Sequence, residues 1–315
     1  MKTKEEIDTF LLHENYYKPG VMLNDPKPVP GQSQAVCVYR EQFSEEIPKF
    51  SMILPIHNQD DIIVRNMKTY FEHTTNSYEI IVILDNCIDN TESEVIGLFE
   101  SLKQNPPFVS AIVIRQDTPI YETPCDNIGF RLARGTYALQ LQPDMQMVET
   151  GYNDSITRPF EKFDDVLGVS GRGCHLFRPW NGPGKLGGKM EQPLEPEWDA
   201  QRDTFFVGET CMRGPLVLHL ERLKIMKYWD EHHFFLGKDE RDLFARSWVE
   251  HKWVCGYVPM EFKSPRRDGS TRKKKSPQDA HFRKIRQKMF APGFWGEHMK
   301  GYPANRRPIT ERSLV

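Results

Sequence analysis

Residues 79–91, with the sequence EIIVILDNCIDNT, contain the pattern that decides the fold. The apolar run Glu79–Leu84 predicts a strand that is buried on both faces. Asp85 follows it at once, and Thr91–Glu94 (TESE) fits a capping box at the start of a helix. The stretch therefore predicts a buried strand that leads directly into a helix.

The same alternation of strand and helix continues on both sides of this stretch. Uniformly apolar strands between amphipathic helices favour a mostly parallel α/β sheet with helices on both faces. Such sheets bind ligands at the carboxyl ends of their strands, so the residues just after each strand are candidates for a site. We predict strands at 51–55, 79–84, 109–114 and 136–141, and helices at 61–73, 91–102 and 126–133.

The chain divides into an N-terminal extension, a main domain and a basic tail. Residues 1–49 contain the pair Pro19–Gly20 and a proline-rich run at 24–34, so we expect loop and short helices there. We expect the main domain over residues 50–262, with one half at 50–150 and the other at 151–262. In the second half we predict strands at 166–170, 204–207 and 253–258, helices at 216–226 and 240–249, and a glycine-rich loop at 171–192.

Composition limits the class of protein. The chain has 315 residues, 38% hydrophobic, which excludes a disordered chain and allows a packed core. It has no apolar run long enough to span a membrane and no apolar leader at Met1–Phe10, so we expect a cytoplasmic protein. The net charge of −2 conceals a basic tail at 263–315, with 15 Lys and Arg against 4 Asp and Glu between Lys263 and Arg312.

The basic tail suggests an anionic partner. Pro265–Lys275 contains Gly and Ser for close approach to phosphate, and Arg272 among the cations that could neutralise it, so a lid over phosphate is one interpretation. A solvated segment or peripheral contact with an anionic membrane is the alternative. Nucleic acid is disfavoured, because its recognition needs more than a run of charge. Trp180 in the glycine-rich loop and Trp198 just after it could stack on an acceptor sugar, or each could simply anchor its loop.

Three groups of carboxylates follow predicted strands or begin a helix. Asp85 could accept hydrogen bonds from a base or ribose hydroxyl. Asp144 could hold a hard divalent cation together with phosphate oxygens. Asp239 and Glu240 could supply a general base. Each also has a plain structural interpretation as a turn residue or a helix cap.

Four motifs in this order resemble the family 2 glycosyltransferases, which are inverting enzymes of the GT-A fold that use nucleotide sugars. The resemblance covers about residues 50–260. The matching segments are Pro55–Asn58, Ile83–Thr91, Asn127–Tyr137 and Gly237–Trp248.

The resemblance implies a role for each matching residue. It places Asp239 or Glu240 as catalytic base, with Asp239 preferred, and Asp144 as the ligand of Mn²⁺ or Mg²⁺. The family's Asp-x-Asp metal motif is Gln142-Pro143-Asp144 here, which leaves one carboxylate. Magnesium commonly uses one or two carboxylates plus substrate phosphates. The implied nucleotide-sugar residues are Pro55, His57, Asn58, Asp85, Asp126 and Asn127, and Arg213 and Gly214 would lie at the donor–acceptor boundary.

Together these residues imply a hexosyl- or pentosyltransferase. It would move a sugar from a nucleoside diphosphate sugar, with UDP favoured, to a glycan, lipid-linked or protein acceptor. The alternative is a nucleotide-sugar-binding scaffold with weak or no activity. A nucleotidyltransferase would need a Gly-rich basic loop after the first strand, and His57–Asp60 is not one. A polyanion-binding protein would show binding that depends steeply on salt.

Overall fold

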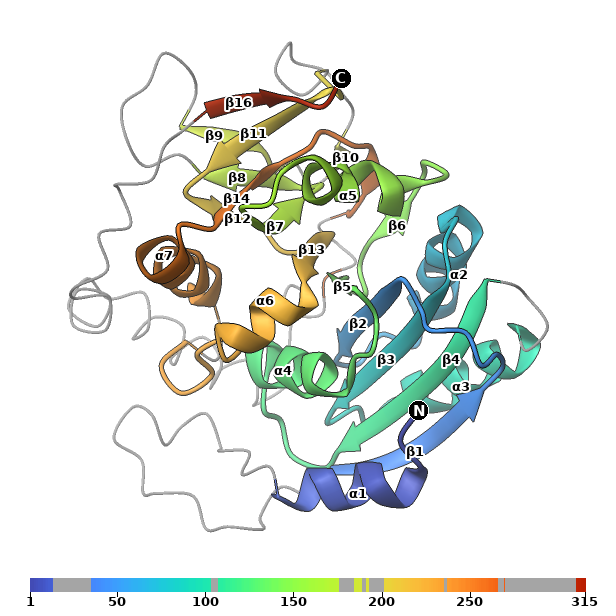
Figure 1. Cartoon of the computed structure of the whole chain (residues 1–315). Helices are drawn as coiled ribbons and strands as arrows, with labels where there is room; N and C mark the ends of the chain where they lie inside the picture. Colours follow the sequence, from blue (N-terminus) through green and yellow to red (C-terminus); the bar gives the residue numbers. More distant parts are fainter. Residues whose placement is uncertain are drawn as a thin grey trace.

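The computed structural model describes residues 1–13, 35–102, 107–175, 184–188, 191–192, 201–234, 237–265, 269 and 310–315. Within these residues one large sheet forms the centre of the protein. Its strands are β1 (Ala35–Gln42), β2 (Phe50–Ile56), β3 (Tyr78–Asp85), β4 (Phe108–Gln116), β5 (Tyr137–Gln140), β7 (Val166–Ser170), β11 (Thr204–Gly208), β13 (Leu216–His219), β14 (Val254–Tyr257) and β16 (Thr310–Ser313). Their order is β1-β4-β3-β2-β5-β13-β7-β14-β11-β16, from the lower to the upper edge in Figure 1.

The predicted parallel strands form one half of this sheet. β4, β3, β2 and β5 lie side by side and all run parallel. Every residue of β2 and β3 is buried, which agrees with their mostly apolar sequences. The other half is mixed, because β13 pairs antiparallel with both β5 and β7 while β14 pairs parallel with β7.

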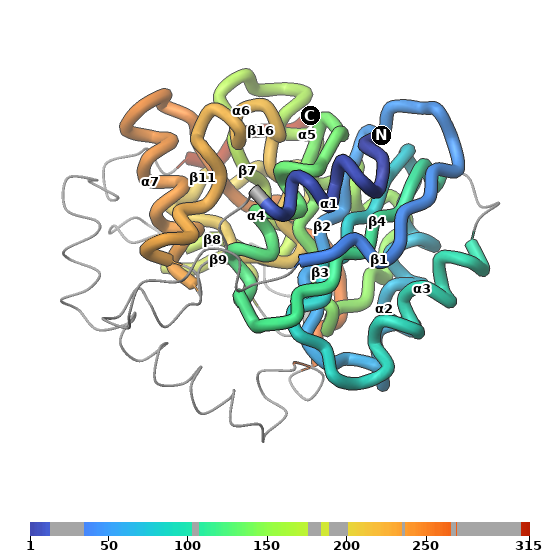
Figure 2. Tube along the Cα trace, turned by 90° about the horizontal axis from the view of Figure 1, so that it is seen from below, coloured from blue at the N-terminus to red at the C-terminus, as the bar shows by residue number. Residues whose placement is uncertain are grey.

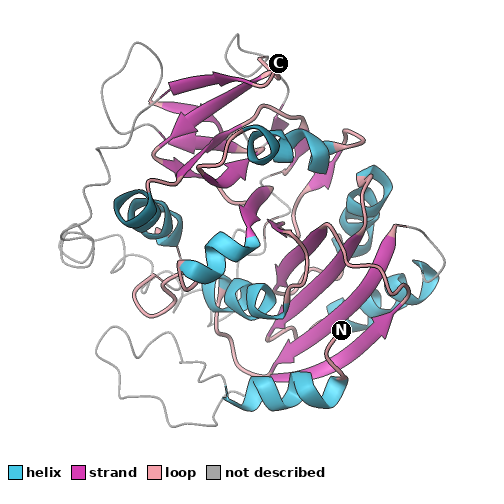
Figure 3. Cartoon of the chain, in the orientation of Figure 1, coloured by secondary structure: helices cyan, strands magenta, loops and turns pink. Residues whose placement is uncertain are grey.

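Helices cover both faces of the parallel strands (Figure 3). Met52 and Leu54 of β2 contribute to one core, whereas Ile53 between them contributes to the other. The first core includes residues of α2 and α3, and the second includes residues of α1 and α4. Figure 2 shows where these four helices lie around the strands. The helices are α1 (Lys4–His13), α2 (Ile63–His73), α3 (Thr91–Leu102), α4 (Glu122–Leu132), α5 (Tyr152–Lys162), α6 (Leu220–Ile225) and α7 (Asp239–His251).

Short strands complete the second half. They form two small three-stranded sheets of the described residues. Their members are β6 (Gln146–Met147), β8 (Gly173–His175), β9 (Lys185–Gly187), β10 (Glu191–Gln192), β12 (Thr210–Cys211) and β15 (Phe262–Lys263). None of the helices within the described ranges is long and apolar enough to cross a membrane.

Three predictions of secondary structure are wrong. The stretch predicted as a glycine-rich loop at 171–192 contains β8, β9 and β10, which pair with other short strands. The helix predicted at 216–226 is a strand followed by a short helix, because Leu216–His219 is inserted between β5 and β7 and its apolar residues are buried there. The extension at 1–49 is not only loop and helix, because Ala35–Gln42 forms β1 and pairs with β4. The end of the basic tail also joins the sheet, as β16 against β11.

The topology gathers several loops at one edge of the sheet. β5 and β7 are both antiparallel to β13, so they run in the same direction. β2 and β3 run parallel to β5. The residues that follow β2, β3, β5 and β7 therefore lie along one edge, which we call the carboxyl edge.

Candidate functional site at the carboxyl edge

The first group of polar residues joins the ends of β2 and β3. His57 Nδ1 lies 2.6 Å from the backbone carbonyl oxygen of Asp85, so Nδ1 is protonated and donates this hydrogen bond. His57 Nε2 then accepts from Asn58 Nδ2 at 3.1 Å, and Asn58 Oδ1 accepts from the amide of Ile88 at 2.9 Å. The imidazole ring is thereby oriented at the carboxyl edge, next to Pro55, which is buried in β2.

Asp85 positions the loop that leads into α4. Its Oδ1 accepts a hydrogen bond from the amide of Ile120 at 2.7 Å, and its Oδ2 accepts from the amide of Tyr121 at 3.0 Å. Burial raises the pKa of the Asp85 carboxyl, while the hydrogen bonds from the two amides oppose that shift. The contact with a nucleoside that the resemblance implies for Asp85 stays a prediction.

Three residues in this region have a left-handed backbone. Asn58 and Asn86 have φ angles of 50° and 52°, which asparagine tolerates. Tyr121 has φ 69° and ψ 179°, a conformation that is almost confined to glycine. Strained residues of this kind persist where neighbouring groups hold them, and the Asp85 carboxylate holds the Tyr121 amide.

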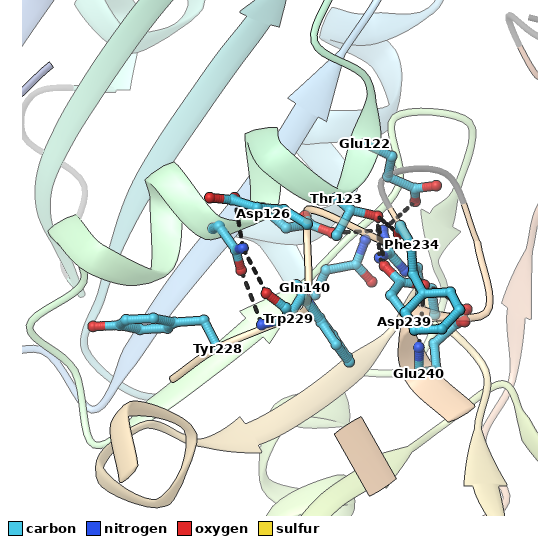
Figure 4. A network of polar contacts seen from close by, with 12 residues as sticks. Glu122, Thr123, Asp126, Gln140, Tyr228, Trp229, Phe234, Asp239 and Glu240 are labelled. Atoms are coloured by element: carbon cyan, nitrogen blue, oxygen red, sulfur yellow. Dashed lines mark hydrogen bonds and ion pairs between the residues drawn. The ribbon is translucent and has the colours of Figure 1, made fainter. Parts of the chain in front are cut away.

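The second group surrounds Arg213, which follows β12. Four carboxylates lie around its guanidinium, and we call these five residues the Arg213 cluster. Asp126 Oδ2 is 2.6 Å and Glu122 Oε1 is 3.2 Å from Nη1, and Glu240 Oε1 is 3.6 Å from Nε. Asp239 Oδ2 contacts Nη2. Figure 4 shows Glu122 and Asp126 approaching from α4, and Asp239 and Glu240 from α7.

Asp239 and Glu240 differ in access to solvent. The Asp239 side chain is 0% exposed, and its Oδ2 accepts from the Thr123 hydroxyl at 2.6 Å in addition to contacting Arg213. The Glu240 side chain keeps 21% of its surface exposed. Burial raises the pKa of Glu240, and Arg213 opposes this shift. Glu240 is therefore the one of the pair whose carboxylate a ligand can reach.

Asp126 and Asn127 connect α4 to the second half of the chain. Both side chains are fully buried. Burial raises the pKa of Asp126 well above its usual value, although Arg213 opposes the shift. Asn127 Nδ2 donates to the carbonyl oxygen of Trp229 at 3.0 Å, and Asn127 Oδ1 accepts from the Trp229 amide at 3.1 Å. Proximity of this pair to a nucleotide stays a prediction.

The third group follows β5, at the position of the predicted metal motif. Gln142 Oε1 accepts a hydrogen bond from Arg172 Nη1 at 2.7 Å. Gln142 Nε2 donates to Glu122 Oε1 at 3.4 Å, which connects this group to the Arg213 cluster. Asp144 lies in the next turn and is half-buried.

These side chains do not fit a divalent metal held by a carboxylate pair. In the part of the chain that the structure describes, no three His, Cys, Asp or Glu side chains are arranged to hold a metal ion. The first position of the motif is the neutral amide of Gln142, and a guanidinium already donates to its oxygen. A positive charge at that point disfavours a second cation. The role of Asp144 as a metal ligand stays a prediction.

Gly214 lies between the second and third groups. Its φ is 58°, and a Cβ atom there would lie 2.8 Å from both Gln142 Cγ and Met145 Sδ. Its carbonyl oxygen is 3.4 Å from Arg172 Nη1. Glycine is therefore required where the chain passes from Arg213 to the residues after β5.

Three residues that the sequence analysis proposed for the site lie outside the described residues: Trp180, Trp198 and Arg272. The structure also brings residues to the site that the sequence analysis missed. Glu122 and Arg172 were not predicted. Arg172 comes just after the buried strand β7, so the rule that marked Asp85 and Asp144 would have identified it.

No protein-family model matches the chain, and no curated protein matches it in sequence. Solved structures do resemble it. The mannosyltransferase PcManGT from Pyrobaculum calidifontis, solved with GDP-Man and Mn²⁺, has 13% identity and a TM-score of 0.50, over 76% of this chain and 60% of that chain. GalNAc-T7, solved with UDP, GalNAc and Mn²⁺, has 15% identity and a TM-score of 0.51, over 69% and 43%. TarS 1–349 from S. aureus, with UDP, has 14% identity and a TM-score of 0.46.

This chain has the GT-A fold. PcManGT and GalNAc-T7 share its central sheet and helices, which confirms the fold class predicted from the sequence. The chain spans 64% of the length of the TarS chain that it matches.

Proposed function

We propose that this protein is a glycosyltransferase that moves a sugar from a nucleoside diphosphate sugar to a hydroxyl group, with inversion at the anomeric carbon. The acceptor class is a glycan, a lipid-linked sugar or a protein. One observation carries the proposal: the His57–Asp85 group, the Gln142 group and the Arg213 cluster lie along one carboxyl edge. UDP- and GDP-sugars are the first donors to test, because the similar structures hold UDP and GDP-Man.

In this proposal the nucleoside part of the donor binds at the carboxyl ends of β2 and β3. His57 is held in one tautomer there, and the strained loop at Tyr121 is held by Asp85. Rigid, strained backbone is typical of ligand sites, because it fixes contacts before the ligand arrives. In this proposal Pro55, His57 and Asn58 line the base and ribose.

Glu240 is the general base of the proposed reaction. It accepts the proton of the acceptor hydroxyl, and the hydroxyl oxygen forms a bond to the anomeric carbon. The bond between that carbon and the diphosphate oxygen breaks, and its electron pair leaves with the nucleoside diphosphate. Attack from the face opposite the leaving group inverts the configuration. The sequence favoured Asp239 as the base. Its carboxylate is buried and already contacts Arg213 and Thr123, so in this proposal Asp239 holds Arg213 in place and does not accept the proton.

The test compares Glu240→Gln with Glu122→Gln, because both carboxylates pair with Arg213 and both are partly exposed. We expect Glu240→Gln to slow release of nucleoside diphosphate by about 100- to 10,000-fold, with donor affinity unchanged. Glu122→Gln should have a much smaller effect. Since the pKa of Glu240 is raised and only its ionised form is a base, the wild-type rate should increase with pH through that pKa. The Gln variant should lack this increase.

Two results would count against the proposal. If no UDP-, GDP- or dTDP-sugar binds the wild-type protein in calorimetry, the donor assignment fails. If a donor binds tightly but no acceptor class and no water accepts the sugar, the protein is a scaffold of the same fold.

A further inference from the structure

Glu122 lies between the two ends of the proposed reaction. It begins α4, and its Oε1 accepts a hydrogen bond from Gln142 Nε2 at 3.4 Å. The same oxygen lies 3.2 Å from Arg213 Nη1, and Arg213 Nε lies 3.6 Å from Glu240 Oε1. The resemblance implies that the diphosphate lies at the end of β5, and Glu240 is the proposed base. Attack opposite the leaving group puts the sugar between them, beside Glu122.

The Glu122 carboxylate has one oxygen that a ligand can use. Gln142 and Arg213 both approach Oε1, whereas Oε2 makes no hydrogen bond to any residue that the structure describes. The side chain keeps 32% of its surface exposed. Because the contacts at Oε1 fix the direction of the carboxylate, Oε2 is an oriented hydrogen-bond acceptor at the surface of the site.

The exposed part of the Arg213 cluster is acidic. Asp126 and Asp239 are fully buried and hold the guanidinium, whereas Glu122 and Glu240 are partly exposed. Arg213 Nε is buried and has no hydrogen-bond acceptor within the described part of the chain, so Glu240 is not locked onto it. A ligand at this surface therefore meets two carboxylates, which accept hydrogen bonds and repel negative charge.

We propose that Glu122 selects the sugar of the donor, with Oε2 accepting a hydrogen bond from a sugar hydroxyl, so that neutral sugars bind in preference to uronic acids. This inference rests on the proposed function. A hydroxyl that donates to a carboxylate forms a charge-assisted hydrogen bond. The carboxylate of a uronic acid has the same charge as Glu122, and like charges repel beyond contact distance where water is partly excluded. The substrate class is a nucleoside diphosphate joined to a neutral sugar.

The experiment measures three matched pairs of donors by calorimetry with Mn²⁺ present. The pairs are UDP-glucose and UDP-glucuronate, GDP-mannose and GDP-mannuronate, and dTDP-glucose and dTDP-glucuronate, with free UDP, GDP and dTDP measured alongside. The members of a pair differ only at one carbon of the sugar. For the diphosphate that binds best, we expect the neutral donor to bind at least about 10-fold more tightly than the uronate.

Glu122→Gln changes the acceptor into a donor. Gln142 and Arg213 both donate toward Oε1, so the new amide keeps its oxygen there and places its NH₂ group at the position of Oε2. The preference for the neutral donor should fall by about 10- to 100-fold, because the neutral sugar loses a charge-assisted hydrogen bond and the uronate loses a repulsion. Affinity for the free diphosphate should not change. A merely structural role would weaken the free diphosphate and both donors alike.

Glu231→Gln is the matched control. Glu231 also accepts from an amide, Asn127 Nδ2 at 2.7 Å, and it also pairs with an arginine, Arg131 at 3.3 Å. Arg131 lies more than two turns further along α4 than Glu122, so the preference for the neutral donor should not change.

Three results would overturn the role of Glu122. They are a uronate that binds as tightly as its neutral partner, a preference that survives Glu122→Gln, and a neutral donor that binds no more tightly than the free diphosphate. Failure of all three diphosphates to bind the wild-type protein would instead overturn the proposed function itself.

Discussion

At the scale of single residues, Tyr121 is the clearest sign that this edge of the sheet is built for something other than stability. Its φ of 69° with ψ of 179° places a bulky side chain where glycine is normally found. The bonds from the Ile120 and Tyr121 amides to Asp85 keep it there. The buried carboxylate of Asp85, at the end of β3, is thus joined by hydrogen bonds to the strained backbone before α4.

We predict that Tyr121→Gly is more stable than Tyr121→Ala by about 1–2 kcal/mol, because both lose the ring but only glycine loses the strained Cβ. Urea unfolding of the two variants measures the difference. Substituting alanine for a glycine normally stabilises a chain in ordinary backbone, so an alanine variant as stable as the glycine variant would show that Tyr121 is unstrained.

At the scale of elements, the Arg213 cluster holds two helices together. α4 contributes Glu122 and Asp126, α7 contributes Asp239 and Glu240, and the loop after β12 contributes the cation between them. Arg213 is 6% exposed, and its Cζ atom lies 5.2 Å from the centroid of the Trp229 ring. α7, which contains the proposed base, is therefore fixed to α4, the helix that follows the loop held by Asp85.

We predict that Arg213→Ala lowers the free energy of unfolding by about 3–5 kcal/mol, because it leaves buried carboxylates without their counter-charge. Arg158→Ala is the control. Arg158 pairs with an exposed Asp203 at 2.8 Å, so its loss should cost about 1 kcal/mol or less. Equal effects of the two substitutions would contradict the bridging role.

Secondary structure could be predicted from the sequence where the spacing of apolar residues fits only one kind of element. β2 and β3 consist mostly of apolar residues and alternate with helices, so their place in a parallel sheet could be predicted. Leu216–Met226 could not be resolved in the same way, because its apolar residues suit a buried strand as well as a helix. The pairing of Arg213 with α4 and α7 depends on segments far apart in the sequence. The choice of Asp239 or Glu240 as the base depends on which side chain is buried, and this could not be predicted because the two residues are adjacent in the sequence.

At the scale of the whole molecule, segments near both ends of the chain form the two outer strands of the sheet. β1 pairs with β4 from Ala35 to Gln42, and β16 pairs with β11 from Thr310 to Ser313. Ile7 and Leu11 of α1 are buried in the second core. Arg312 pairs with Asp165 at 2.5 Å and fastens β16 to the turn before β7.

We predict that deletion of residues 1–49, which the sequence marks as an extension, destabilises the protein and promotes association through the uncovered edge of β4. Size-exclusion chromatography and urea unfolding measure both effects. Deletion of residues 1–13 removes α1 but keeps β1. This shorter variant should be less stable than the full chain, but the edge of β4 should stay covered. If the longer deletion leaves both measurements unchanged, the boundary at residue 49 is a true domain boundary.

The position of β16 has a consequence for how the chain folds during synthesis. Val207 of β11 pairs with Thr310, so β11 leaves the ribosome long before its outer neighbour exists. Synthesis is slow compared with the formation of single elements. Among the described strands, the nascent chain therefore has no partner for this side of β11 until residues 310–313 emerge, and we expect it to depend on chaperones during that interval.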